Sequence, residues 1–299
     1  GAHPLSTNRD ETVRTRPGLP WLYVAPAIIL LLAFLVYPAV DTFRLSFLGR
    51  NAAGYVGLDN YVYAFTSSEM HVAFRNNFVY WLIFATGFVV LGGLIVAVLA
   101  DRVRYESVFK SIIFLPQAIS FVGAGIIWRF VYDYRPQLGL LNAVIDGLFP
   151  DYRPIGWLVN ARTATAALII IFVWMWTGFT MVILSAALKG IPKEILEAAR
   201  TDGANAWQTF WQIQVPMIAS TIGVVTTTVI IFVLKVFDLV YVMTAGRYNT
   251  NVMANQMYRE LYVIRHFGRS SAIAIILLLA ITPMMFINIR RFREQEALR

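Results

Sequence analysis

The chain has 299 residues, of which 58% are hydrophobic and only 14% are charged, and this composition excludes an ordinary soluble domain. Lys and Arg number 25 against 17 Asp and Glu, but they gather at the ends of apolar segments, so we expect membrane lipids and no nucleic acid as their partners. The absence of cysteine excludes disulfides, thiolate metal sites and cysteine nucleophiles.

The hydropathy pattern predicts an all-α polytopic membrane protein. A polar cytoplasmic N-terminal tail is predicted over residues 1–20, a transmembrane domain over 21–289 and a basic cytoplasmic C-terminal tail over 290–299. Six segments of the domain match the roughly 20 residues that a helix needs to cross a bilayer. They are residues 21–47, 78–100, 111–132, 163–188, 217–242 and 270–289.

The third predicted crossing contains Pro116. A proline cannot donate the backbone hydrogen bond that the Ile112 carbonyl would accept, so we expect the helix to be loosened beside Gln117 and Ser120. The loop after this crossing, residues 133–162, is predicted to contain a short helix at residues 138–148.

An even number of crossings places both termini on the same side of the membrane. Lys and Arg number 13 in the tails and loops on that side and 9 in the loops on the other side. Because cytoplasmic loops carry the excess of basic residues, both termini are predicted to be cytoplasmic. The four arginines of the last outer loop count against this orientation, but the two tails and the loop after the fourth crossing outweigh them.

The interval between the fourth and fifth crossings, residues 189–216, is polar and is predicted to form two helices. Pro192 suits the first turn of the first helix, and Gly203 after Asp202 suits a left-handed stop. In the second helix, side chains recur on one face as in a helix that lies along the membrane boundary. They are Trp207, Phe210, Trp211 and Gln214.

The centre of the first helix places the two methyl side chains of Ala198 and Ala199 beside the Glu197 carboxylate. Another protein could therefore approach the backbone closely while one charge sets its register. The spacing of these residues relative to Gly203 and to Ile213, Val215 and Pro216 resembles the EAA loop in the membrane subunits of ATP-binding-cassette importers.

The resemblance implies that this loop docks into a cytoplasmic ATPase subunit. The coupling residues that it implies are Glu197, Ala198, Ala199, Asp202 and Gly203. The alternative is an amphipathic surface loop with an internal Glu197–Arg200 pair.

No energy-converting motif is visible in the chain. It has neither a G-x-x-x-x-G-K-[ST] phosphate loop nor H-E-x-x-H, and its three histidines, His3, His71 and His266, lie outside the apolar segments. We therefore predict no catalytic residue, metal site or cofactor here, and expect ATP and Mg²⁺ on partner subunits. Because no internal duplication is present, the chain is predicted to supply half of a pathway. Six helices that close a pathway alone are the alternative.

Two charged residues fall within the fifth predicted crossing. Lys235 and Asp238 are three residues apart, which would place them on one helix face, and a charge at the bilayer centre costs about 2.5–3.5 kcal/mol. They are expected either to line a pathway or to form a structural ion pair near the outer boundary. A proton-coupled secondary sugar carrier that titrates both residues is the alternative function.

Aromatic and amide side chains within the crossings favour a carbohydrate substrate. Trp174 and Trp176 lie too deep in the fourth crossing for interfacial residues. Aromatic faces pack against the C–H faces of sugar rings, and amides such as that of Gln117 bond hydroxyl groups. Ordinary helix packing is the alternative for these tryptophans.

Two further stretches, residues 114–117 and 237–244, resemble maltose-type carbohydrate permeases, and residues 251–258 resemble the α-glucoside branch. The resemblance implies a bacterial or archaeal plasma membrane, a heterodimeric pore with a second homologous permease subunit, two cytoplasmic ATPase subunits and an extracytoplasmic sugar-binding protein. The substrate contacts that it implies are Gln117, Phe121, Trp176, Phe179, Lys235 and Val236. This chain departs from the family at Gln117, where an aromatic residue is usual, and at Lys235 and Val236, where amides are usual.

Overall fold

The computed structural model describes residues 19–101, 103–149 and 152–297, so the predicted tail of residues 1–20 lies outside it except for its last two residues. Within the described residues the secondary structure is helical, and the one extended pairing is an isolated bridge between Leu48 and Tyr55. Four of these helices are long and apolar enough to cross a membrane, or six if each of two bent helix pairs is one span.

The first apolar span, Trp21–Leu45, combines α1 (Leu19–Leu31), η1 (Leu32–Val36) and α2 (Tyr37–Leu45). None of its apolar window is buried within the chain. Its hydrophobic side chains can therefore face lipid or another subunit. The short helix α3 (Asp59–Thr66) follows it.

The second span is a continuous helix of 33 residues made of α4 (Ser68–Arg75), η2 (Asn76–Ala85) and α5 (Thr86–Ala100). It begins ten residues before the predicted start at residue 78. Polar residues do not end the helix here because they are bonded inside the protein. The buried Asn76 donates from Nδ2 to the backbone oxygens of Asn249 (2.6 Å) and Asn251 (2.7 Å).

The third predicted crossing is sharply bent. The helix α6 (Glu106–Phe114) and the 3₁₀ segment η3 (Leu115–Ala118) meet α7 (Phe121–Val131) at 102°. Pro116 lies in η3, as expected of a residue without a backbone donor. The Ser120 hydroxyl caps α7 by accepting the Gly123 N–H at 3.1 Å. The short helix predicted in the next loop is confirmed as α8 (Leu140–Leu148).

The centre of the bundle is α9 (Ala164–Lys189), which matches the fourth predicted crossing within one residue. Of its apolar window, 61% is buried. Two glycines allow its neighbours to approach closely. A Cβ added at Gly93 of α5 would lie 2.3 Å from Cγ2 of Thr180, and one added at Gly178 would lie 2.4 Å from the backbone oxygen of Ile113.

The polar interval contains α10 (Lys193–Thr201), α11 (Ala206–Gln208), η4 (Thr209–Gln214) and α12 (Val215–Met217). The next helix, α13 (Ala219–Leu234), lies at 69° to the Ala206–Met217 segment.

The prediction of one helix over residues 217–242 is wrong, because α13 ends at Leu234 and α14 (Asp238–Thr244) is a separate helix. Asn77 Nδ2 donates to the Leu234 oxygen at 3.3 Å. A side chain from the second span thus satisfies a carbonyl at the end of α13, which would otherwise need the next helical turn.

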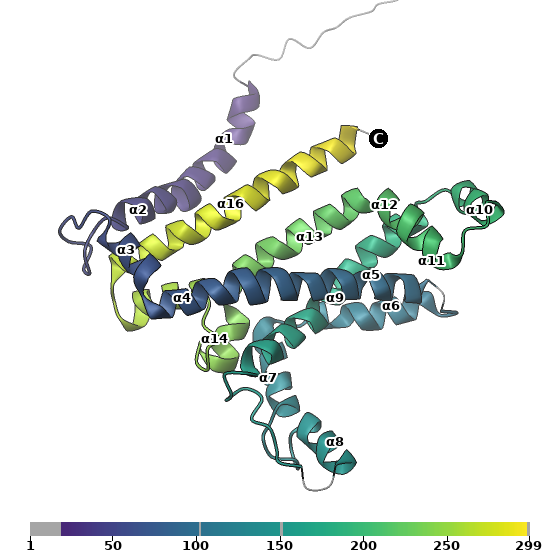
Figure 1. Ribbon diagram of the computed structural model, residues 1–299. Helices are drawn as coiled ribbons and strands as arrows, with labels where there is room; N and C mark the ends of the chain where they lie inside the picture. Colours follow the sequence, from purple (N-terminus) through teal and green to yellow (C-terminus); the bar gives the residue numbers. More distant parts are fainter. Residues whose placement is uncertain (1–18, 102, 150–151, 298–299) are drawn as a thin grey trace, which may run out of the picture.

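The chain closes with α15 (Met253–Tyr258), η5 (Arg259–Val263) and α16 (Phe267–Ala297). The last helix contains the whole sixth predicted crossing and continues into residues predicted as a tail. It packs against α13 and α15, while α9 packs against α5 and α6. Figure 1 shows α10 and α11 at one end of the bundle and α7, α8 and α14 at the other.

Candidate functional site

The helix α10 is delimited at both ends by backbone geometry. Pro192 directly precedes it, with ψ of 134°. At its other end Gly203 has φ of +82°. The Gly203 N–H donates to the Arg200 oxygen at 3.1 Å, and the Ala204 N–H donates to the Ala199 oxygen at 3.0 Å. These two bonds form a Schellman motif, so the left-handed stop predicted at Gly203 is confirmed.

The two faces of α10 have different surroundings. Ala199 is only 6% exposed, and Leu196 is half-buried against the same core that contains Phe210. Glu197 and Ala198 are exposed on the other face. Of the two alanines expected to meet a partner, only Ala198 therefore presents its methyl group outward, whereas the small side chain of Ala199 lets α10 lie close to the bundle.

The helix α11 begins with a capping box. Asn205 accepts from the Gln208 N–H, and the Gln208 side chain accepts from the Asn205 N–H, each at 2.9 Å. Trp207 and Trp211 are exposed and meet edge to face with ring centroids 5.6 Å apart. Phe210 turns toward the core, so the predicted aromatic face is divided between the bundle and its surroundings.

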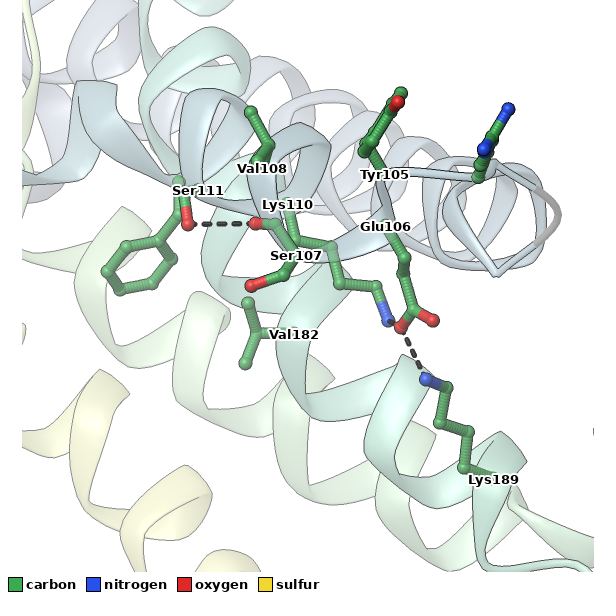
Figure 2. Close-up of a pocket in the computed structure, with 10 residues that line it drawn as sticks. Tyr105, Glu106, Ser107, Val108, Lys110, Ser111, Val182 and Lys189 are labelled. Atoms are coloured by element: carbon green, nitrogen blue, oxygen red, sulfur yellow. Dashed lines mark hydrogen bonds and ion pairs between the residues drawn. The ribbon is translucent and has the colours of Figure 1, made fainter.

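A charged cluster, defined here as Asp101, Glu106, Lys110, Ser185 and Lys189, joins α9 to α6. Lys110 Nζ lies 2.7 Å from Asp101 Oδ1, and the Ser185 hydroxyl donates to the same oxygen at 2.7 Å. Figure 2 shows that Lys110 and Lys189 both reach the Glu106 carboxylate. Several of these residues line a cleft of about 820 Å³.

None of the sequence patterns described above predicts this charged cluster. The one local signal was the four-residue spacing of Glu106 and Lys110, which forms an ion pair along α6. The contacts with Ser185 and Lys189 cross 75 or more residues of sequence. Lys189 is the last residue of α9 and precedes α10 directly in the chain. The charged cluster therefore connects the base of α10 to α6.

An aromatic cluster brings several of the implied substrate residues together. The Trp176 ring is 7% exposed and lies 5.5 Å from that of Phe179 and 4.3 Å from that of Phe232, between centroids. Phe172 stacks on Trp176 at 5.7 Å and on Phe121 at 6.4 Å. Phe121, Trp176 and Phe179 are thus joined through ring contacts.

Of the other three implied substrate residues, only Lys235 has a ring contact with this cluster. Lys235 is exposed, and its Nζ lies 5.7 Å from the Phe232 ring centroid. Gln117 lies on η3, which packs against α9, and its buried Oε1 has no hydrogen-bond partner among the described residues. Val236 is 6% exposed and packs in the core.

Lys235 and Asp238 do not share a helix face. Lys235 caps the end of α13, and Asp238 is the first residue of α14. Within the part of the chain that the structure describes, no ion pair joins them. The expectation from their spacing is wrong because the helix breaks between them.

A helical bundle with an exposed, capped helix between two of its long helices is the architecture that the EAA resemblance leads us to expect of a permease subunit. Residues 89–289 match the family described as the binding-protein-dependent transport system inner membrane component, and the chain belongs to that family. The resemblance inferred from the EAA spacing is confirmed.

Relatives of known name support this assignment. The chain is 56% identical over 282 residues to the osmoprotective compounds uptake permease protein GgtC of Synechocystis sp.. The aligned residues cover 93% of this chain and 100% of GgtC. It is 45% identical over 282 residues to the alpha-glucoside transport system permease protein AglF of Rhizobium meliloti. This alignment covers 93% of this chain and 83% of AglF.

The fold is also similar to that of a solved transporter. A chain in the crystal structure of a bacterial ABC transporter involved in the import of the acidic polysaccharide alginate matches with a TM-score of 0.79 at 23% identity. The match covers 92% of this chain and 95% of that chain.

Proposed function

We propose that this chain is a membrane-spanning permease subunit of an ATP-driven, binding-protein-dependent importer of an α-glucoside or a similar small carbohydrate. It crosses the plasma membrane of a bacterium or archaeon six times, with each bent helix pair as one span. Its permease domain, residues 21–289, contains the coupling loop 189–216 and lies between two cytoplasmic tails.

The observation that carries the proposal is the exposed face of α10 at one end of the bundle. Glu197 and Ala198 project from this face, and the exposed Asp202 and Gly203 end it. A cytoplasmic ATPase subunit bound to this face would, when it moved, shift the whole of α10 as one rigid helix. The Lys189–Glu106 ion pair would transmit that displacement to α6. Two ATPase subunits would hold ATP and Mg²⁺, with catalysis on those subunits.

The aromatic cluster around Trp176 supports a carbohydrate as substrate. Aromatic rings offer flat faces to the C–H groups of a sugar, and the unpaired Gln117 Oε1 offers an acceptor to a hydroxyl. We assign substrate contacts to Gln117, Phe121, Trp176, Phe179 and Lys235, with Val236 packed behind them. Trp176 is buried by neighbours within this chain, so a sugar could reach it only after helices move apart. We therefore infer that the pathway opens by helix movement and is completed by a second homologous permease subunit.

Reconstitution tests the transport proposal. The tagged chain is purified in mild detergent with the proteins that accompany it, and the complex is placed in liposomes with ATP inside and a sugar-binding protein outside. Uptake of a radiolabelled α-glucoside should require internal ATP and should persist in the presence of a protonophore. Uphill uptake by this chain alone would overturn the proposal.

Replacement of Trp176 tests the substrate site. Trp176→Phe keeps a ring in the aromatic cluster, so the complex should assemble while α-glucoside uptake falls severalfold. Trp174→Phe is the matched control, because Trp174 lies on the same helix but packs against Trp128 instead. Equal loss of uptake in both variants, or loss of assembly in Trp176→Phe, would assign Trp176 to packing alone.

The proton-coupled carrier is not favoured by the structure. That mechanism requires Lys235 and Asp238 to exchange a proton or to share a site, and the break after α13 places them on different elements.

A further inference from the structure

A second cleft, of about 530 Å³, lies at the end of the bundle opposite α10. One wall is the end of α7 together with residues 156–159, and the other wall is α14 and the turn after it (Figure 1). Under the proposed orientation this cleft opens on the extracytoplasmic side. It is separate from the aromatic cluster, because none of the residues that line it belongs to that cluster.

The chemistry of the lining suits a polyhydroxylated ligand. Tyr134, Tyr241 and Tyr248 are exposed and line the cleft, so each combines an aromatic face with a hydroxyl group. Arg247 adds a planar donor that can bond two neighbouring hydroxyls at once, and Arg129 adds a second guanidinium to the lining.

The lining also contains a charged acceptor, the Asp133 carboxylate. Arg135 donates to it from Nε (3.0 Å) and Nη2 (2.9 Å). These bonds hold the pKa of Asp133 at about 2, below its ordinary value of 3.8. The acceptor therefore stays ionised, and the Arg135 guanidinium balances its charge.

The wall that carries Tyr248 is held in a strained conformation. Ala245, Tyr248 and Asn249 have φ of 52°, 55° and 60°, in the left-handed region that non-glycine residues rarely adopt. Hydrogen bonds between the Thr244 and Thr250 hydroxyls (2.6 Å) and from Asn76 to the Asn249 oxygen (2.6 Å) fix the turn. Such strain is typical of places where a side chain is held in position for a ligand.

The opposite wall is fixed by the buried Asn142. Its Nδ2 donates to the backbone oxygens of Asp133 (2.8 Å) and Ile155 (3.0 Å). Its Oδ1 accepts the Ile155 N–H at 3.0 Å. Arg129 joins the two walls by donating to the Val242 oxygen. Both walls are therefore rigid before any ligand arrives, which lowers the entropy cost of binding.

One donor beside the cleft has no partner. Trp157 lines the cleft, and its indole Nε1 is buried without an acceptor among the described residues. An unpaired buried donor is unfavourable, so a ligand that pairs it gains affinity.

We propose that this cleft is an outer carbohydrate subsite that binds a ring of a glycoside before the glycoside reaches the aromatic cluster. The subsite rests on the proposed function, because a sugar importer is what gives the tyrosines and arginines a polyhydroxylated ligand. It adds a binding step outside the membrane core that depends on Tyr134 and Tyr248.

Photolabelling of the intact complex in lipid nanodiscs tests the subsite. A diazirine-bearing α-glucoside should label peptides that contain residues 129–134 or 241–248, and excess methyl α-glucoside should suppress this labelling. Labelling that no free sugar suppresses would overturn the proposal.

Substitutions connect the labelling to the cleft. Tyr134→Ala and Tyr248→Ala should each lower it about fivefold, as expected for one lost ring contact, whereas Tyr248→Phe should keep it. Tyr55→Ala, at an exposed tyrosine outside the cleft, is the control and should have no effect. Normal labelling in both alanine variants would refute the subsite. If ATP-dependent uptake proceeds while labelling is confined to the Trp176 peptide, the subsite fails and the proposed function stands. Absence of ATP-dependent uptake would instead count against the proposed function.

Discussion

Lys110 Nζ and Asp101 Oδ1 lie 2.7 Å apart, and the same Asp101 oxygen accepts a hydrogen bond from Ser185 of α9. The Lys110 side chain is only 16% exposed, so this pair is shielded from water and held by more than one contact. The Lys110–Asp101 pair and the Lys189–Glu106 ion pair together link the end of α9 to the start of α6.

Removal of the Lys110 charge should weaken this link between α9 and α6. Lys110→Met keeps the length of the side chain but leaves Asp101 and Glu106 without this cation, so the melting temperature of the complex should fall by several degrees. Sugar transported per ATP hydrolysed should also fall. Arg162→Met, at an exposed arginine on a distant loop, is the control. Additive effects of Lys110→Met and Asp101→Asn in a double-mutant cycle would contradict the interpretation.

The contact at Gly178 is expected to tolerate no side chain. A Cβ there would lie 2.4 Å from the Ile113 oxygen, and because this neighbour is backbone, α6 would have to move away from α9. We expect Gly178→Ala to lower stability by about 1–3 kcal/mol, as overpacked cores do. Thermal unfolding of the purified complex measures this. Gly87→Ala, with nothing within 4 Å of its Cβ, should not destabilise, and equal melting temperatures for the two variants would disprove the argument.

The left-handed stop after α10 gives a test of coupling. Gly203 has φ of +82° and open space around its Cβ position, so Gly203→Ala introduces backbone strain without a clash. A cost of about 1–2 kcal/mol at this residue should destabilise the end of α10. Sugar moved per ATP should decrease while the binding protein retains its affinity for sugar. Gly147→Ala in α8 has no Cβ neighbour within 4 Å and should transport normally. Full coupling in Gly203→Ala would argue against a docking role for this face.

His266 should make stability depend on pH. Its Nδ1 accepts the Arg269 N–H at 3.2 Å at the start of α16, which requires an unprotonated nitrogen. Burial, followed by the positive charge of Arg269, lowers the pKa of His266 below its ordinary 6.5.

Because the unfolded chain binds this proton more readily, the stabilisation is complete above about pH 6.5 and is lost as the pH falls through the lowered pKa of the folded state. Melting temperatures measured from pH 8 to pH 5 should therefore decline. His266→Asn keeps a capping acceptor but does not titrate, so its decline should be smaller. An unchanged pH profile in this variant would show that another group is responsible.

Much of the fold could be predicted because it depends on local patterns. The fourth crossing, α9, and the short helix α8 follow from apolar runs and their polar flanks, and the glycine stop of α10 follows from backbone sterics at one residue. The family was equally accessible, because the EAA spacing lies within a single loop.

Other features depend on partners far away in the sequence. Asn76 and Asn77 are polar and directly precede the predicted start of the second crossing. They nevertheless lie inside its helix, because their side chains bond to backbone groups within residues 234–253. The bond from Asn77 to the Leu234 oxygen also helps to end α13 before Lys235, which separates Lys235 from Asp238. The charged cluster likewise needs Ser185 and Lys189 beside α6.

The sequence by itself determined which segments are apolar, where single residues end or bend a helix, and which family the coupling spacing resembles. Only the tertiary structure decided which polar side chains are paired inside the bundle, which alanine of α10 is exposed, and which aromatic rings meet. The physical reason is that hydropathy and backbone sterics act within a few residues, whereas buried hydrogen bonds and ring contacts require chain segments that only folding brings together.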